Sequence, residues 1–208
     1  MTTTMQRMVI SGEPERIRRV LDAIRGRMWT DNELFDLNAI TRMPEAAAIT
    51  ASLTGLDVIV EIYGQGEMDK YQQQLEAAGA RCFAETGCYW WSDWMQVNWG
   101  SYSNVCYVRE GSILGELFFQ TSGCPIAPAL RTLSANFPDV DIMLEFVELL
   151  DMDFSSIGFS IFTGGREDRF AVDWCSADAR DIRRRLDCID DAVDEGDDLY
   201  PPSSEFIN

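Results

Sequence analysis

Residues 113–148 constrain the fold of this chain more than any other stretch. Residues 113–121 alternate in side-chain direction and are apolar enough to be buried on at least one face, which predicts a strand. Cys124-Pro125 then opens a helix, because proline in the first turn of a helix gives up no hydrogen bond. That predicted helix, residues 125–136, has an apolar stripe made by Ile126, Leu130, Leu133 and Phe137.

A second predicted strand follows at residues 139–148. Its apolar side chains alternate with acidic ones, so pleating should place Asp139, Asp141 and Glu145 together on the face opposite the buried one. We therefore expect a half-buried strand with an acidic outer face.

The remaining elements extend this pattern to an α+β fold. The residues 6–11 (strand), 13–26 (helix), 104–109, 113–121, 125–136 and 139–148 give the order β-α-β-β-α-β, which is the ferredoxin-like order. Residues 27–98 would be a helical, Trp-rich insertion after the first helix, and an extra C-terminal hairpin and helix would follow the core. We expect an antiparallel sheet with two helices on one face, a single domain over residues 1–186, and an acidic tail over 187–208.

Several motifs resemble the YubB-type ferredoxin-like family, whose members are carried by plasmids and phages. The resembling segments are Val9–Ile24, Phe35–Ala46, Asn98-Trp99-Gly100 and the proline-opened helix PIAPALRTLSANFPD. The resemblance covers roughly residues 6–163 and is strongest over 94–146. The chain lacks the Trp-Cys pair that usually precedes the first strand in members of the family. The resemblance implies a fold and a mobile-element origin, and it implies no catalytic residues.

The chain contains no histidine and one lysine, which removes most routes to catalysis. Without histidine there is no Ser-His-Asp or Cys-His arrangement and no usual general base near neutral pH. No P-loop, G-x-G-x-x-G or C-x-x-C motif is present. We therefore expect a non-enzymatic protein without cofactor or metal. The six cysteines predict free thiols in a reducing cytosol, and no targeting or membrane-spanning segment is evident, so a cytoplasmic location is expected.

The formal net charge is 17 − 35 = −18, and the acidic residues are concentrated toward the C-terminus. Such a chain repels free nucleic acid and attracts a basic partner. The run of aromatic residues from Tyr89 to Trp94 is read as core packing, because no basic residue lies between Arg81 and Arg109 to hold a phosphate backbone. The residues predicted to contact a basic partner are Asp139, Asp141, Glu145, Glu148, Asp190, Asp191, Asp194, Glu195, Asp197 and Asp198.

Two functions of different classes follow from these features. The first is an acidic interaction protein of a mobile genetic element that inhibits a host nucleic-acid-binding defence protein, of the anti-CRISPR or anti-restriction type, by presenting a nucleic-acid-like negative surface to its Arg/Lys-rich side. The alternative is a small carboxylate-based, metal-dependent enzyme or ligand-binding protein that uses a cleft between insertion and sheet. Three or more converging carboxylates would favour the alternative.

Overall fold

The computed structural model describes residues 2–26, 33–54, 65–150 and 153–186. Its sheet has six strands in the order β2-β3-β1-β4-β5-β6, and every neighbouring pair is antiparallel. The strands are β1 (Thr2–Ser11), β2 (Cys106–Glu110), β3 (Glu116–Ser122), β4 (Asp141–Leu150), β5 (Asp153–Thr163) and β6 (Arg166–Ala171). The helices are α1 (Pro14–Ile24), α2 (Leu37–Ile40), α3 (Glu45–Thr54), α5 (Gln65–Thr86), α6 (Trp91–Asn98), α7 (Ala127–Asn136) and α8 (Ala177–Leu186). The predicted α+β class is confirmed.

The strand β1 lies at the centre of the sheet, between β3 and β4. It begins at Thr2, which is opposite Leu150, and Thr3 is opposite Ser122. The strand predicted over residues 6–11 therefore begins earlier, at Thr2, because strand pairing on both sides satisfies the backbone of this segment.

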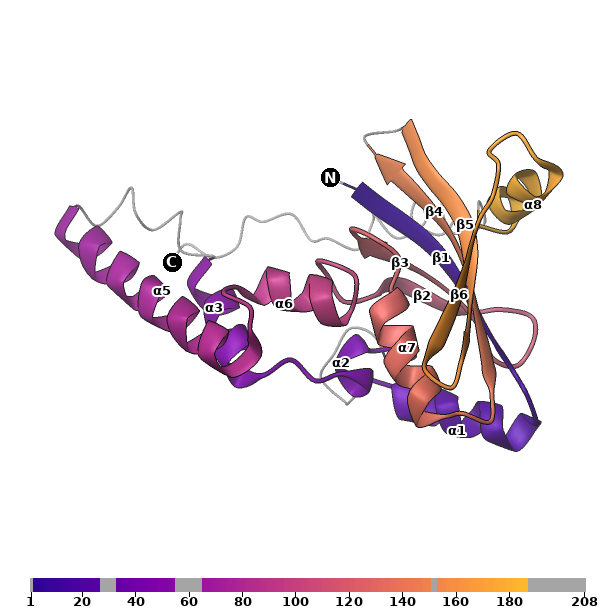
Figure 1. Ribbon diagram of the computed structural model, residues 1–208, viewed down its shortest axis with the longest axis horizontal. Helices are drawn as coiled ribbons and strands as arrows, with labels where there is room; N and C mark the ends of the chain where they lie inside the picture. The colour runs from indigo at the N-terminus through magenta and orange to yellow at the C-terminus, as the bar shows by residue number, and fades with distance from the viewer. Residues whose placement is uncertain (1, 27–32, 55–64, 151–152, 187–208) are drawn as a thin grey trace, which may run out of the picture.

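One face of the sheet, the helix face, is covered by α1 and α7 (Figure 1). In α1 the buried residues Ile17, Val20 and Ile24 recur at spacings of three and four, so a single stripe of the helix packs inward. The core on this face includes Met8, Ile10, Leu117, Phe119, Ile142 and Leu144. These residues occupy alternate positions of their strands, as pleating requires.

The opposite face carries the C-terminal helix α8, so we call it the α8 face (Figure 1). A second, smaller core of Met5, Val147, Ile157, Ala179, Ile182 and Leu186 lies beneath that helix. The predicted arrangement had its two core helices on one face and assigned no cover to the other. The acidic outer face expected for β4 is instead partly covered by α8. The buried Ile182 and Leu186 of that helix pack against apolar side chains of the sheet.

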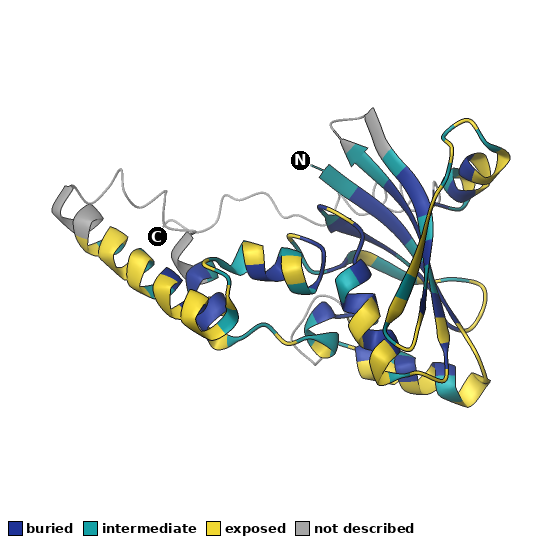
Figure 2. Ribbon diagram, in the orientation of Figure 1, coloured by how far each residue is buried: buried dark blue, intermediate teal, exposed yellow. Residues whose placement is uncertain are grey.

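The insertion forms a helical arm made of α3, α5 and α6 that extends away from the sheet (Figure 1). Much of the side of α5 remote from α3 and α6 is exposed (Figure 2). The helix α5 continues through Gly79 to Thr86, although a glycine often ends a helix. The missing side chain of Gly79 lets Tyr89 and Trp90 pack closely against the helix. The segment Leu56–Tyr63, assigned as weakly helical from sequence, lies outside the described residues.

Two tryptophans join the arm to the core. Trp94 and Trp99 are buried with their rings edge to face, 5.5 Å apart, and the Trp99 indole N–H donates to the carbonyl of Thr41 at 2.9 Å. The core packing predicted for the run Tyr89–Trp94 is confirmed for Trp94, whereas Tyr89 is 49% exposed. Within the described ranges, no helix has the length and apolar character needed to cross a membrane.

Candidate functional site

A row of side chains crosses all six strands on the α8 face. Arg109 of β2 is opposite Phe118 of β3, which is opposite Arg7 of β1, and Arg7 is opposite Glu145 of β4. The row continues through Phe159 and ends at Phe170, and these two rings stack at 4.7 Å. Opposed side chains in adjacent antiparallel strands are direct neighbours, so strand register alone builds this arrangement.

Arg7 lies in the middle of the row and binds two carboxylates. Its Nε and Nη2 lie 2.7 and 2.6 Å from Oε1 of Glu116, and its Nη1 donates to Oε2 of Glu145 at 2.9 Å. The Arg7 side chain is only 13% exposed. A guanidinium buried to this extent requires such charged partners, because a buried charge without them is costly.

The carboxylate of Glu145 also binds an arginine of α8. Arg185 of that helix donates from Nη2 to Oε1 at 2.5 Å and from Nε to Oε2 at 3.0 Å. Glu145 is therefore 5% exposed, enclosed between two arginines of its own chain. The expectation that Glu145 lies on an exposed acidic face is wrong. Alternation does turn it away from Leu144 and Phe146, but α8 covers that side and Arg185 binds the carboxylate there.

Glu116 lies deeper in the same network. Its Oε2 accepts hydrogen bonds from the backbone N–H of Ser112 at 2.8 Å and of Ile113 at 3.4 Å. Burial acts to raise the pKa of Glu116, but the hydrogen bond and charge of Arg7 together with these two N–H groups outweigh it, and the pKa is lowered. The same carboxylates outweigh the effect of burial on Arg7, whose pKa is raised.

Sequence reasoning did not identify this network. The sequence signal for the network was that two single charged residues, Arg7 and Glu116, lie within stretches whose other residues predict buried strands. Charged residues at such positions are almost never fully buried unless they are paired, so each one indicates a partner elsewhere in the fold.

Asp139 and Asp141 are exposed, as predicted. Asp139 lies beside the turn that precedes α1, since Arg16 contacts both Asp139 Oδ2 at 3.3 Å and Glu13 Oε2 at 3.5 Å. Glu13, Glu15, Asp139 and Asp141 are all exposed at this end of the sheet, and we call them the acidic corner. Arg16 and Arg18 pair within it, so the corner offers carboxylates of which some are partly neutralised.

Glu148 faces the other way. It is opposite Thr4, in the same alternating set as Phe146 opposite Gln6, and so points to the helix face. It is half-buried and accepts a hydrogen bond from the Ser156 hydroxyl. A single surface containing Glu148 together with Asp141 and Glu145 does not exist in this fold. The other predicted contact residues, Asp190, Asp191, Asp194, Glu195, Asp197 and Asp198, lie outside the described residues.

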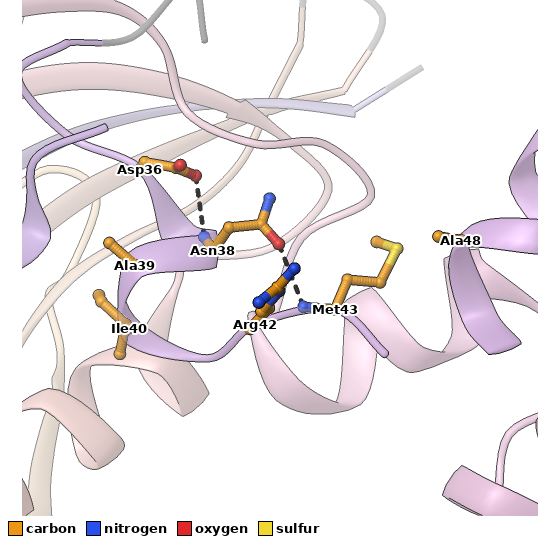
Figure 3. A pocket seen from close by; sticks show the side chains of 7 residues that line it. All are labelled: Asp36, Asn38, Ala39, Ile40, Arg42, Met43 and Ala48. Atoms are coloured by element: carbon orange, nitrogen blue, oxygen red, sulfur yellow. Dashed lines mark hydrogen bonds between the residues drawn. The ribbon is translucent and has the colours of Figure 1, made fainter. Parts of the chain in front are cut away.

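The junction between core and insertion contains a pocket of about 630 Å³, shown in Figure 3. Asp36, the carboxylate among its described lining residues, is 5% exposed and accepts from the backbone N–H of Asn38 at 2.9 Å and from the Asn104 side chain at 2.7 Å. Asn38 in turn accepts from the Met43 backbone at 3.1 Å. These contacts cap α2 and fix the path into the arm. Asp36 has a structural role that fully accounts for its position.

No group of three or more cysteine, aspartate or glutamate side chains suitable for holding a metal ion occurs in the part of the chain that the structure describes. The carboxylate-based alternative needs such a convergence. The network around Arg7 offers the opposite chemistry, because each of its carboxylates is already bound by arginine: Glu116 by Arg7, and Glu145 by Arg7 and Arg185. No protein-family model, curated protein or solved structure matches this chain. The functional argument therefore rests on the geometry above.

Proposed function

We propose that the chain is a non-enzymatic acidic interaction protein of a mobile genetic element. In this proposal it inhibits a host nucleic-acid-binding defence protein, of the anti-CRISPR or anti-restriction type, by occupying its Arg/Lys-rich surface. The core would be ferredoxin-like, and the strand order β2-β3-β1-β4 with helices after β1 and β3 supports that assignment. The motif resemblance to a plasmid- and phage-borne family supports the origin.

The observation that carries the proposal is the uneven use of charge. Several basic side chains in the described part of the chain pair with its own acids, among them Arg7, Arg131 and Arg185. Exposed carboxylates remain at the acidic corner, and residues 187–208 add eight acidic residues with no basic one. A surface of this kind attracts a basic protein over a long range and repels nucleic acid. The contact residues we propose are therefore Asp139 and Asp141 with six of the eight acidic tail residues, without Glu145 or Glu148; the six are Asp190, Asp191, Asp194, Glu195, Asp197 and Asp198.

The test is a phage challenge in bacteria that carry a defined restriction or RNA-guided nuclease system, with an otherwise identical strain lacking that system. Expression of the chain is expected to raise the plating efficiency of a sensitive phage only in the defended strain. A contact variant should lose this effect. It replaces Asp139, Asp141, Asp190, Asp191, Asp194, Glu195, Asp197 and Asp198 by the corresponding amides.

The matched control removes eight exposed carboxylates elsewhere and so changes net charge by the same amount. It replaces Asp22, Glu33, Glu45, Glu76, Glu85, Asp93, Asp168 and Asp178 by amides, all of which are exposed. This control should keep its activity. Equal loss in both variants would mean that total charge alone matters, and no protection against any tested system would contradict the inhibitor role.

A further inference from the structure

The pocket at the junction between core and insertion contains one negative and one positive side chain that the protein leaves unpaired. Asp36 and Arg42 are the charged residues of its described lining (Figure 3). Among the described residues, neither forms an ion pair with the other or with a third residue. The volume of about 630 Å³ lies within the range of small-molecule sites, about 300–1,000 Å³.

The Asp36 carboxylate is buried without a counter-charge. The residue is 5% exposed, and both of its hydrogen bonds, from the Asn38 N–H and the Asn104 amide, are made by Oδ1. Its second oxygen, Oδ2, accepts no hydrogen bond from the part of the chain that the structure describes. The capping role needs Oδ1 alone, which the amide of an asparagine supplies as well. Because a buried charge without a partner is costly, Oδ2 offers a place for a cationic group from outside the chain.

Arg42 supplies the opposite charge to the same pocket. It is exposed, and its guanidinium makes no hydrogen bond within the described ranges. A guanidinium presents a planar fork of N–H donors that matches a carboxylate. Asn38 lies between Asp36 and Arg42 in Figure 3, with its amide nitrogen directed away from the bond that its oxygen accepts from Met43. That nitrogen is a second donor for an anionic group.

The rest of the described lining is apolar and consists of Ala39, Ile40, Met43 and Ala48. Ile40 and Met43 also pack against the main core, so the fold holds this wall in place. A single carboxylate beside an apolar wall does not suit a divalent metal ion, which takes six or more oxygen ligands. It suits an organic cation.

We propose that this pocket binds a small zwitterion with an apolar side chain, a free amino acid or a dipeptide. Its ammonium group binds Oδ2 of Asp36, and its carboxylate binds Arg42 with the Asn38 amide as a further donor. Its side chain lies against the apolar wall. A zwitterion carries no net charge, so the −18 charge of the chain does not repel it. This binding uses none of the residues of the partner contact proposed above.

The test measures binding to the full-length chain by calorimetry, with L-leucine and leucyl-leucine as probes. Each probe is also used as its C-terminal amide, which lacks the carboxylate, and in its N-acetyl form, which lacks the ammonium group. We expect one-to-one binding of at least one zwitterion and at least about tenfold weaker binding of its two blocked forms, since each loses a charge-assisted bond. The amide is the stricter comparison, because it is cationic and the net charge of the chain attracts it. Tighter binding of leucine identifies an amino-acid ligand, and tighter binding of leucyl-leucine identifies a peptide.

Two variants should change the discrimination between probes in a crossed pattern. D36N keeps Oδ1 for the capping bonds and removes the charge, so it should bind the preferred zwitterion at least about tenfold more weakly and no better than its N-acetyl form. R42Q should bind the zwitterion and its amide alike. A folding defect weakens all probes equally and cannot produce this pattern. Arg42 is exposed, so R42Q decides the question even if D36N is unstable.

The matched controls are E45Q and R81Q, which remove one charge of each sign at exposed positions outside the described lining. Both should bind every probe as the native chain does. The proposal is overturned if neither zwitterion binds, if the blocked forms bind as tightly as the zwitterions, if R42Q keeps the native discrimination, or if the controls weaken binding as much as the pocket variants.

Discussion

Arg7 and Glu145 lie directly opposite each other on the two central strands of the sheet, with Arg7 Nη1 2.9 Å from Glu145 Oε2. Arg185 of α8 binds the same carboxylate. The pair therefore connects the sheet centre to the C-terminal helix, and its effect on stability can be separated from any effect on partner binding.

Replacing Glu145 with Gln should destabilise the protein strongly. The neutral amide keeps the shape but leaves Arg7 and Arg185 facing each other without the carboxylate that binds both. Breaking a buried pair costs about 3–5 kcal/mol, and we expect about 3 kcal/mol because Arg185 is partly exposed. For a chain of this size that corresponds to a Tm lower by about 6–12 °C.

The matched variant is Asp141→Asn on the same strand. Asp141 is exposed and accepts from the Thr163 hydroxyl at 2.6 Å, so its Tm should change by no more than about 2 °C. Thermal unfolding of both variants measures the two Tm values. Similar Tm values for the two would contradict the role assigned to Glu145.

The strand β4 shows how far sequence reasoning reaches in this protein. Alternation correctly predicted that Val140, Ile142, Leu144 and Phe146 are buried, because strand periodicity is a local property. It could not predict what covers the second face, since that depends on where α8 packs and on Arg7 in a strand 138 residues away. The acidic residues of the strand predicted at 139–148 therefore separate into the exposed pair Asp139 and Asp141, the enclosed Glu145, and Glu148 on the other face.

Gly111→Ala, in the loop before β3, should destabilise the protein more than the addition of one methyl group suggests. The new Cβ would stand 2.1 Å from one Glu116 oxygen and 2.3 Å from its Cγ, so loop and carboxylate must separate. We expect a loss of about 1–3 kcal/mol in the free energy of unfolding, the range for overpacking a well-packed site. Denaturant unfolding measures it. Gly87→Ala is the comparison variant. A Cβ at Gly87 meets nothing within 4 Å, but φ there is +77°, so this variant measures backbone strain without crowding. A Gly111→Ala protein as stable as the native one would show that the loop moves without cost.

The cysteines should react in an order set by burial. Cys124 and Cys175 are exposed free thiols and should modify first, while Cys82 is buried and should be slow. Burial raises the pKa of Cys106, and burial with the nearby Asp93 charge raises that of Cys88, so both thiolates are scarce at neutral pH. Time-resolved labelling with mass spectrometry checks the order. In denaturant without reductant all six should react; four or fewer, restored to six by reductant, would reveal a disulfide.

The depressed pKa of Glu116 predicts a specific acid sensitivity. In the unfolded chain this carboxyl titrates near the ordinary value of about 4.3, and in the folded protein its pKa is lower, because Arg7 and two backbone N–H groups outweigh the effect of burial. A group whose folded pKa is lowered stabilises the protein at pH values above the unfolded pKa, and this stabilisation is lost as pH falls through the folded pKa. We therefore expect stability to decline below about pH 4.3, with part of the decline due to Glu116.

Glu116→Gln should be less stable than the native protein at neutral pH and should lose less stability on acidification, so the two stability curves converge at low pH. Denaturant unfolding from pH 7 to 3 measures this, with Glu110→Gln, an exposed neighbour, as the control that follows the native curve. Parallel curves for Glu116→Gln and native protein would show that the Arg7–Glu116 pair contributes nothing to the acid response.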